Sequence, residues 1–303
     1  MPLNDQFPKA VAFVVGWRKD PTGSLVQTAI GTAFFVAVPN TSGDAGWICA
    51  VTARHVIEME TQTWLRVRAK DGSIQLITTT PWVQHPSADV AVAHMPSPDT
   101  LDIKWLTMTD FLDLSPTMPA LGDPVYFIGL LAMAGSMVAE NVPMVRSGTL
   151  GRMYQEGVPL QRGDGTISHH VVHLIDCRSF GGFSGSPCFA EFRVPPRPGL
   201  AGVFIGGLSA LPETKCIGLI SGHFDDLAKV RAIEELADDP VVKAIRFPVN
   251  TGVGIVTPIE KVRECLMDGS LVAMRQLAEA MAAAQTETEP TVKEADQEEP
   301  AGA

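Results

Sequence analysis

Short apolar runs separated by turn-forming residues fill the first 260 positions, and this pattern constrains the fold more than any other feature of the chain. The runs are rich in Val, Ile, Phe and Ala and alternate with Gly, Pro, Asn and Asp, which is the signature of β-strands and their connections. Amphipathic helices do not separate successive runs, which disfavours a parallel α/β sheet. The expected strands cover residues 10–16, 31–38, 46–51, 64–69, 75–80, 90–94, 124–128, 148–152, 170–176, 186–189, 203–206, 216–221 and 252–256.

The length allows these strands to form more than one barrel. The 303 residues fit two β-barrels of about 110–140 residues each. We therefore expect an all-β fold, with a first barrel over residues 1–115 and a second over residues 116–256.

Two segments depart from the β pattern. Residues 227–236 have the composition and spacing of a helix. A C-terminal helix is predicted over residues 257–285, because Thr257-Pro258-Ile259-Glu260 is a capping box with proline at the first helical position, and it should pause at Gly269-Ser270. A stripe on its second half either packs on the parent domain or binds a partner; it comprises Leu271, Met274, Leu277 and Met281.

The net charge of −11 argues against a nucleic-acid partner, because such a partner needs a basic surface. Six acidic residues and one basic residue give residues 286–303 a charge of −5, which leaves −6 for the rest of the chain. This tail has too little apolar surface to fold, so we expect it to be disordered.

The cysteines and the N-terminus indicate the compartment. Five thiols are spread along the chain with no metal-type spacing, which is typical of reduced, buried cysteines. The N-terminal residues carry no basic region ahead of a signal-peptide core, and no run approaches the ~18 apolar residues that span a bilayer. We expect a cytoplasmic protein with no membrane partner.

Three short segments hold the reactive side chains. A histidine ends a strand in Thr52-Ala53-Arg54-His55-Val56, and an acid precedes a strand in Ser87-Ala88-Asp89-Val90. A serine lies in the glycine-rich turn Gly182-Phe183-Ser184-Gly185-Ser186-Pro187. A serine hydroxyl becomes nucleophilic when a base takes its proton, and an acid behind an imidazole fixes the tautomer that acts as that base. Glycines leave room for two backbone N–H groups to converge on an oxyanion.

These segments resemble the trypsin/chymotrypsin-like serine peptidases, in particular the bacterial branch that includes the HtrA proteases. The order histidine, aspartate, serine along the chain is the order that this family uses. The resemblance covers residues ~10–270 and implies two six-stranded Greek-key β-barrels followed by a helix. Further matching segments are Gly31-Thr32-Ala33-Phe34, Leu121-Gly122-Asp123-Pro124, Ser147-Gly148-Thr149-Leu150, Ile217-Gly218-Leu219-Ile220-Ser221-Gly222 and Gly252-Val253-Gly254-Ile255.

The resemblance implies a role for each residue. His55 is the general base, Asp89 orients it, and Ser184 attacks the scissile carbonyl. The backbone N–H groups of Gly182 and Ser184 form the oxyanion hole. The substrate is a protein or peptide, and the reaction needs neither a metal nor an organic cofactor.

Three departures from the family limit how far it can be followed. Phe183 stands where members activated by proteolysis hold an aspartate, so zymogen cleavage of that type is not expected. The disulfides of secreted members cannot be placed, and the stretch after residue 260 is too short for a PDZ domain.

The sequence offers several candidates for the residues that select the substrate side chain. Arg178 stands six residues before the nucleophile, at the family's pocket base, and would favour an acidic side chain before the cleaved bond. Ser221 and His223 would also line the pocket. One alternative is that Arg178 faces solvent or pairs with Asp176. Another is that Asp225 and Asp226 reach the pocket and favour basic substrates.

Two insertions flank the expected site, over residues 191–215 and 224–250. We expect these insertions or the C-terminal helix to restrain the site until a partner or effector rearranges it. A different hypothesis is a binding or signalling scaffold that kept the fold without turnover. An esterase is disfavoured, since the serine lacks the second glycine of a nucleophile elbow and the order of the triad differs.

Overall fold

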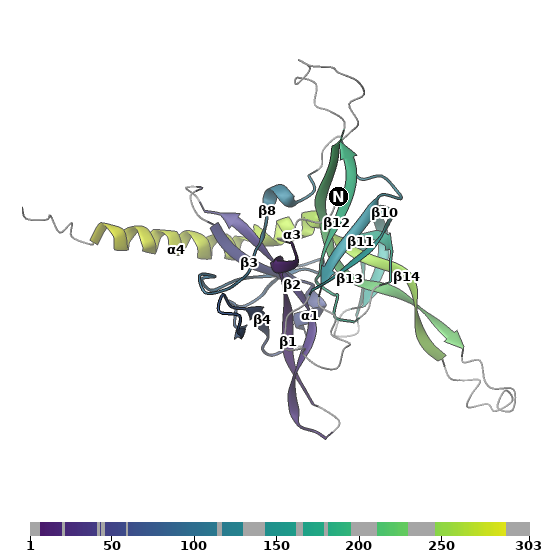
Figure 1. Cartoon of the computed structure of the whole chain (residues 1–303), viewed down its shortest axis with the longest axis horizontal. Helices are drawn as coiled ribbons and strands as arrows, with labels where there is room; N and C mark the ends of the chain where they lie inside the picture. The colour runs from purple at the N-terminus through teal and green to yellow at the C-terminus, as the bar shows by residue number, and fades with distance from the viewer. Residues whose placement is uncertain are drawn as a thin grey trace, which may run out of the picture.

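The structure is a computed structural model that describes residues 7–19, 22–40, 43, 46–58, 60–113, 117–129, 143–161, 166–178, 181–194, 211–229 and 246–288. Two mainly antiparallel sheets lie side by side, and two helices follow them (Figure 1). The all-β, two-barrel class with a C-terminal helix is confirmed.

The first sheet carries eight strands, in the order β5-β4-β1-β2-β3-β7-β6 with β8 paired in parallel to β2. The sheet has more strands than the expected six. The 15-residue β2 pairs with three strands, β1, β3 and β8, and the short strands β5 and β6 form the two edges of the sheet. The elements are η1 (Phe7–Ala10), β1 (Val11–Lys19), β2 (Leu25–Pro39), β3 (Gly46–Thr52), α1 (Arg54–Glu58), β4 (Trp64–Arg68), β5 (Ile74–Ile77), β6 (Val83–Gln84), β7 (Ala91–His94), β8 (Leu106–Thr107) and η2 (Met108–Asp110).

The second sheet closes into a six-stranded barrel, in the order β10-β11-β14-β13-β12-β9. Its strands are β9 (Pro124–Gly129), β10 (Met144–Gln161), β11 (Ile167–Asp176), β12 (Pro187–Val194), β13 (Leu211–Lys229) and β14 (Arg246–Pro258). The outer ends of β13 and β14 leave the barrel as a two-stranded ribbon (Figure 1).

The helix expected over residues 227–236 is wrong at its start. Leu227–Lys229 belong to β13 and pair with Arg246–Pro248 of β14, so the long pairing of the two strands overrides the local helical composition. Residues 230–236 of that helix, and the strand expected over residues 203–206, lie outside the described residues.

The C-terminal helix is two helices, α3 (Ile259–Leu266) and α4 (Gly269–Thr288). The capping box at Thr257 is wrong: Pro258 is the N-cap, and the Thr257 hydroxyl lies 2.5 Å from the hydroxyl of Ser221 instead. Residues 286–288 of the predicted tail are helical, and the rest of it lies outside the described residues. Among the helices that the structure describes, none is long and apolar enough to span a membrane.

One hydrophobic core runs through both sheets and joins them. The rings of Phe7, just before the first sheet, and Phe189, on β12 of the second sheet, stack with their centroids 4.6 Å apart. Val262 and Leu266 of α3 are fully buried in the same core. The helix is therefore an integral part of the double barrel.

Candidate active site

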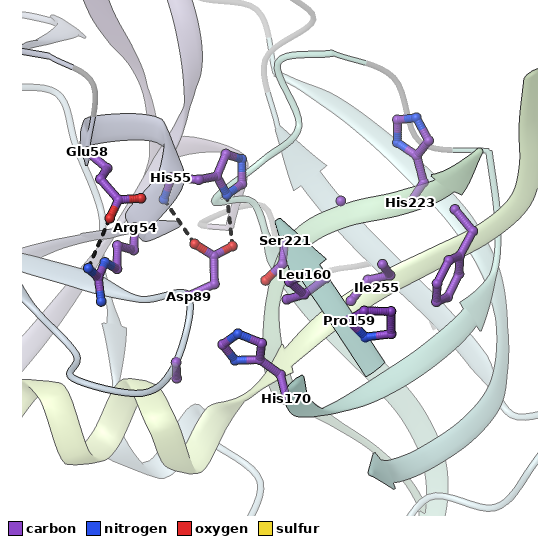
Figure 2. Close-up of a pocket in the computed structure, with 13 residues that line it drawn as sticks. Arg54, His55, Glu58, Asp89, Pro159, Leu160, His170, Ser221, His223 and Ile255 are labelled. Carbon is purple, nitrogen blue, oxygen red and sulfur yellow. Dashed lines mark hydrogen bonds and ion pairs between the residues drawn. The ribbon is translucent and has the colours of Figure 1, made fainter. Parts of the chain in front are cut away.

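His55 and Asp89 meet at the edge of the first sheet. His55 lies on α1, directly after β3, where the buried side chains of Val56 and Ile57 fix the helix. The backbone N–H of His55 donates to Asp89 Oδ1 at 2.9 Å, and His55 Nδ1 lies 2.8 Å from Asp89 Oδ2 (Figure 2). Because both carboxylate oxygens bind the same residue, the aspartate sets the position of the imidazole and assigns its Nδ1 proton.

Burial and charge oppose one another in this pair. Burial lowers the pKa of His55, but the charge and hydrogen bond of Asp89 outweigh it, so the pKa is raised from its ordinary value. Burial raises the pKa of Asp89, but the charge and hydrogen bonds of His55, with a smaller contribution from the Ser221 hydroxyl, lower it overall. The pair therefore favours an ionised aspartate beside an imidazole of enhanced basicity.

Ser184 lies in a turn that both sheets hold. The backbone N–H of Thr32, on β2, donates to the Ser184 carbonyl at 2.8 Å, and the Thr32 hydroxyl donates to the Gly182 carbonyl at 2.7 Å. On the other side, the Gly185 N–H donates to the Ile220 carbonyl of β13 at 2.7 Å. These bonds fix the serine backbone across the junction of the two sheets.

Two glycines make this turn possible. Gly182 has φ 101° and Gly185 has φ 88°, a left-handed region that other residues rarely adopt. A Cβ on Gly185 would also overlap the Thr32 carbonyl oxygen and meet the Thr52 hydroxyl at 2.5 Å. The sequence signal of a glycine-rich turn around Ser184 thus has a steric cause.

The backbone N–H groups of Gly182 and Ser184 donate to no group among the described residues. Within the same part of the chain, the Ser184 hydroxyl makes no hydrogen bond to the His55 ring. Such contacts are often long in unliganded sites and tighten when substrate binds.

Phe183 anchors the serine turn in the hydrophobic core. Its ring is fully buried and packs edge-on against Phe127 of β9, with the centroids 5.3 Å apart. An ionised side chain at this position would have to be paired, whereas the phenyl ring needs no partner. The turn is held by hydrophobic packing in place of a charge pair.

A pocket of about 460 Å³ opens beside His55 and Asp89, between the two sheets. Ser221 and His223 of β13 line it, and Ser221 lies next to Asp89 (Figure 2). Arg178 is exposed and does not line it.

A family model described as a trypsin-like peptidase domain matches residues 31–193, more than half of the chain, and spans all three segments above. The chain belongs to the trypsin-like peptidase family. The membership makes this peptidase a serine endopeptidase, a hydrolase of peptide bonds.

Several solved structures are similar to this peptidase. The MamO protease domain from Magnetospirillum magneticum, in its apo form, is 16% identical, with a TM-score of 0.47, covering 87% of this chain and 99% of that one. The active form of the Rv3671c protease from M. tuberculosis is 16% identical, with a TM-score of 0.48, covering 86% and 80% respectively. Deg5 is 12% identical, with a TM-score of 0.46, covering 87% and 92%. No curated protein sequence matches.

The pocket of the peptidase has an apolar end and a polar end. Leu160 of β10 and Ile255 of β14 lie at the apolar end, away from the His55 ring (Figure 2). Phe224 of β13 also lines the pocket. Arg54 and Glu58 of α1 pair at 2.9 Å at the polar end. In the described part of the chain, no group of three or more His, Cys, Asp or Glu side chains is arranged to hold a metal ion.

The sequence did not single out two contributors. The Thr32 hydroxyl, which holds the Gly182 carbonyl, was visible only as a motif position. His85 lies four residues before Asp89, and its ring accepts backbone N–H groups of the turn between them. A histidine followed by proline just before a strand is a turn signal, but only the fold shows what its ring contacts.

Proposed function

We propose that the peptidase cleaves peptide bonds with Ser184 as nucleophile, His55 as general base and Asp89 as the group that orients His55. The observation that carries the proposal is the double hydrogen bond from His55 to Asp89, next to a serine turn held by both sheets. The three roles require that Asp89 hold the His55 ring in one orientation and that the backbone of Ser184 be fixed at the junction of the two sheets.

The proposed reaction has two halves. His55 Nε2 takes the proton of the Ser184 hydroxyl as the oxygen attacks the carbonyl carbon, and the charge of Asp89 stabilises the resulting imidazolium. The N–H groups of Gly182 and Ser184 donate to the developing oxyanion. His55 then gives its proton to the leaving amine, and water, activated by the same ring, releases the acyl group from Ser184.

We also propose a substrate preference. The apolar end of the pocket favours an apolar side chain near the cleaved bond, because burying it there releases water from Leu160, Phe224 and Ile255. An acidic side chain before the bond is the second preference, through the charge of Arg178 and a ring N–H of His223. The apolar preference is the stronger proposal, since Arg178 does not line the pocket.

Digestion of a peptide library by the full-length protein, read by mass spectrometry, tests both proposals. We expect cleavage next to apolar residues, and we expect it to disappear in Ser184→Ala. An excess of acidic residues at the cleaved bond, lost in Arg178→Gln, would transfer the preference to Arg178. Peptides that the wild type leaves intact, with Ser184 unreactive toward a fluorophosphonate, would support the scaffold hypothesis instead.

We further propose that the peptidase is cytoplasmic and that a partner protein regulates it. Five buried thiols without a disulfide are consistent with a reducing compartment. Met274, Leu277 and Met281 are exposed on α4, whereas Leu271 on the same helix is fully buried. The first turn of α4 is thus packed on the barrels, whereas the rest of the helix leaves apolar side chains open to a partner.

Substituting serine for the three exposed residues tests this regulation. The triple variant should match the wild type when both are pure, but host extract should stimulate only the wild type. Leu121→Ser is a control, because Leu121 is also an exposed apolar residue but lies in the turn before β9, far from α4 in sequence. Equal stimulation of the triple variant and the wild type would rule out α4 as the regulatory surface.

A further inference from the structure

His85 builds the turn that carries Asp89. The buried ring accepts two backbone N–H groups at Nδ1, from Ser87 at 3.1 Å and from Ala88 at 2.9 Å. The backbone N–H of His85 also donates to the Val90 carbonyl at 2.9 Å, which closes the turn on either side of Asp89. One side chain therefore shapes the backbone that sets where the Asp89 carboxylate lies.

The other ring nitrogen reaches the C-terminal helix. His85 Nε2 lies 3.0 Å from Glu264 Oε2 on α3, and Lys261 Nζ binds the same carboxylate at 2.8 and 2.9 Å. Because Nδ1 accepts two N–H groups, the hydrogen-bond pattern assigns the ring proton to Nε2, where the carboxylate of Glu264 accepts it. Glu264 thereby fixes the tautomer that the turn requires.

A third contact ties this turn to the helix of His55. Arg54 Nη1 donates to the His85 carbonyl at 3.2 Å, while Arg54 Nη2 pairs with Glu58 at 2.9 Å. His85 thus lies between α3, which follows the second barrel, and α1, which carries His55.

We propose that His85 is a positioning residue for the Asp89–His55 pair and that Glu264 makes this positioning depend on the C-terminal helix. The inference rests on the proposed function, in which Asp89 orients His55. Both Asp89 oxygens bind His55, so a small displacement of the turn disturbs two hydrogen bonds at once. Misplacement by about 1 Å can cost about 100-fold in rate.

Steady-state kinetics of His85→Ala, Glu264→Ala and His85→Asn test the proposal. We expect His85→Ala to lower kcat about 10- to 100-fold with little change in KM, because His85 holds the backbone of Asp89 but does not itself line the pocket. Glu264→Ala should lower kcat less, about 3- to 10-fold, since the Nδ1 contacts can persist without the tautomer being fixed. An asparagine oxygen can accept the turn N–H groups, so His85→Asn should recover most of the loss.

Lys261→Ala is the matched control. It removes the other partner of Glu264 on the same helix face but leaves both His85 and the Glu264 carboxylate in place. We expect its kcat to stay within twofold of the wild type. A loss in Lys261→Ala equal to that in Glu264→Ala would show a general effect of the helix surface and would overturn the proposal.

An NMR titration of the His55 ring gives a readout that needs no turnover. In His85→Ala and Glu264→Ala the pKa of His55 should fall, because a displaced Asp89 raises it less. Glu264 is half exposed, so its variant keeps the test open if His85→Ala does not fold. Wild-type kcat and an unchanged His55 titration in Glu264→Ala would refute the inference alone. An unreactive Ser184 in the wild type would instead refute the proposed function.

Discussion

At the scale of single residues, the site depends on opposing environmental effects that the fold balances. Burial alone would weaken His55 as a base and would favour a protonated Asp89. Their contact reverses both tendencies, so the pair is effective only as a unit. The same logic explains Phe183, where a buried ring replaces a charge that would need a partner.

Asp89→Asn should separate these effects. The amide carries no charge to stabilise the imidazolium, and its NH2 group can donate to Nδ1 and favour the wrong tautomer, so kcat/KM should fall about 10⁴-fold. A protonated His55 cannot take the serine proton, so activity is lost as pH falls through the pKa of His55. In the wild type that pKa is raised above the ordinary 6.5. The acid limb of the pH–rate profile should therefore move to lower pH in the variant.

Glu58→Gln is the comparison for that experiment. Glu58 raises the pKa of His55 only as the smallest of the named causes, so its acid limb should move much less. An acid limb that stays in place in Asp89→Asn would show that His55 is not the group titrating.

Phe183→Ala tests the hydrophobic anchor of the serine turn. Removing a fully buried phenyl ring that packs on Phe127 should reduce the free energy of unfolding by about 3–5 kcal/mol, measured with urea. Phe183→Leu keeps most of the volume and should cost about 1 kcal/mol. Equal stability of the alanine variant and the wild type would contradict the proposed anchor.

At the scale of elements, β10, β11 and α3 are joined by a partly buried polar cluster. The backbone N–H of Tyr154 donates to His173 Nδ1 at 3.1 Å, and the Tyr154 hydroxyl donates to Glu260 Oε1 at 2.8 Å. Tyr154 has φ 51°, which is strained for a residue with a side chain. The cluster holds α3 onto the second barrel and so supports the face that carries Glu264.

This cluster predicts how stability depends on pH. Burial lowers the pKa of His173 to about 4, below its ordinary 6.5, so between those values the unfolded chain binds more protons than the folded one. The free energy of unfolding should therefore fall as pH is lowered through this window, by up to about 1.4 kcal/mol per pH unit from this group.

His173→Asn should flatten that part of the curve, because asparagine can accept the Tyr154 N–H but does not titrate. Urea unfolding between pH 4 and pH 7 measures the slope. Identical slopes in the variant and the wild type would assign the acid sensitivity to other groups.

Sequence patterns predicted elements well where the signal is local. Apolar runs located most strands, but β6 and β8 have two residues each and cannot show an alternation. β13 was expected to end at Ser221 but continues to Lys229. Its outer end is stabilised by pairing with β14, which a local apolar pattern does not reveal. The capping box at Thr257 failed because a serine 36 residues away engages the threonine hydroxyl.

At the scale of the whole molecule, the two sheets each supply what the other lacks. The first sheet carries His55 and Asp89, and the second carries Ser184, while Thr32 bonds the serine turn across the junction. The order of the three motifs along the chain predicted that the histidine and the aspartate belong to one barrel and the serine to the other. The contact of α3 with the Asp89 turn, through His85 and Glu264, was not predictable, since it joins residues 179 apart.

Labelling of Ser184 by a fluorophosphonate probe tests the central claim most directly, because it requires both sheets to present their residues together. The full-length protein should form one adduct, mapped by mass spectrometry to Ser184, and His55→Ala should slow its formation by at least about 100-fold. The other serines of the chain serve as internal controls in the same spectrum. An adduct on another serine, or labelling of Ser184 at an equal rate in His55→Ala, would contradict the account.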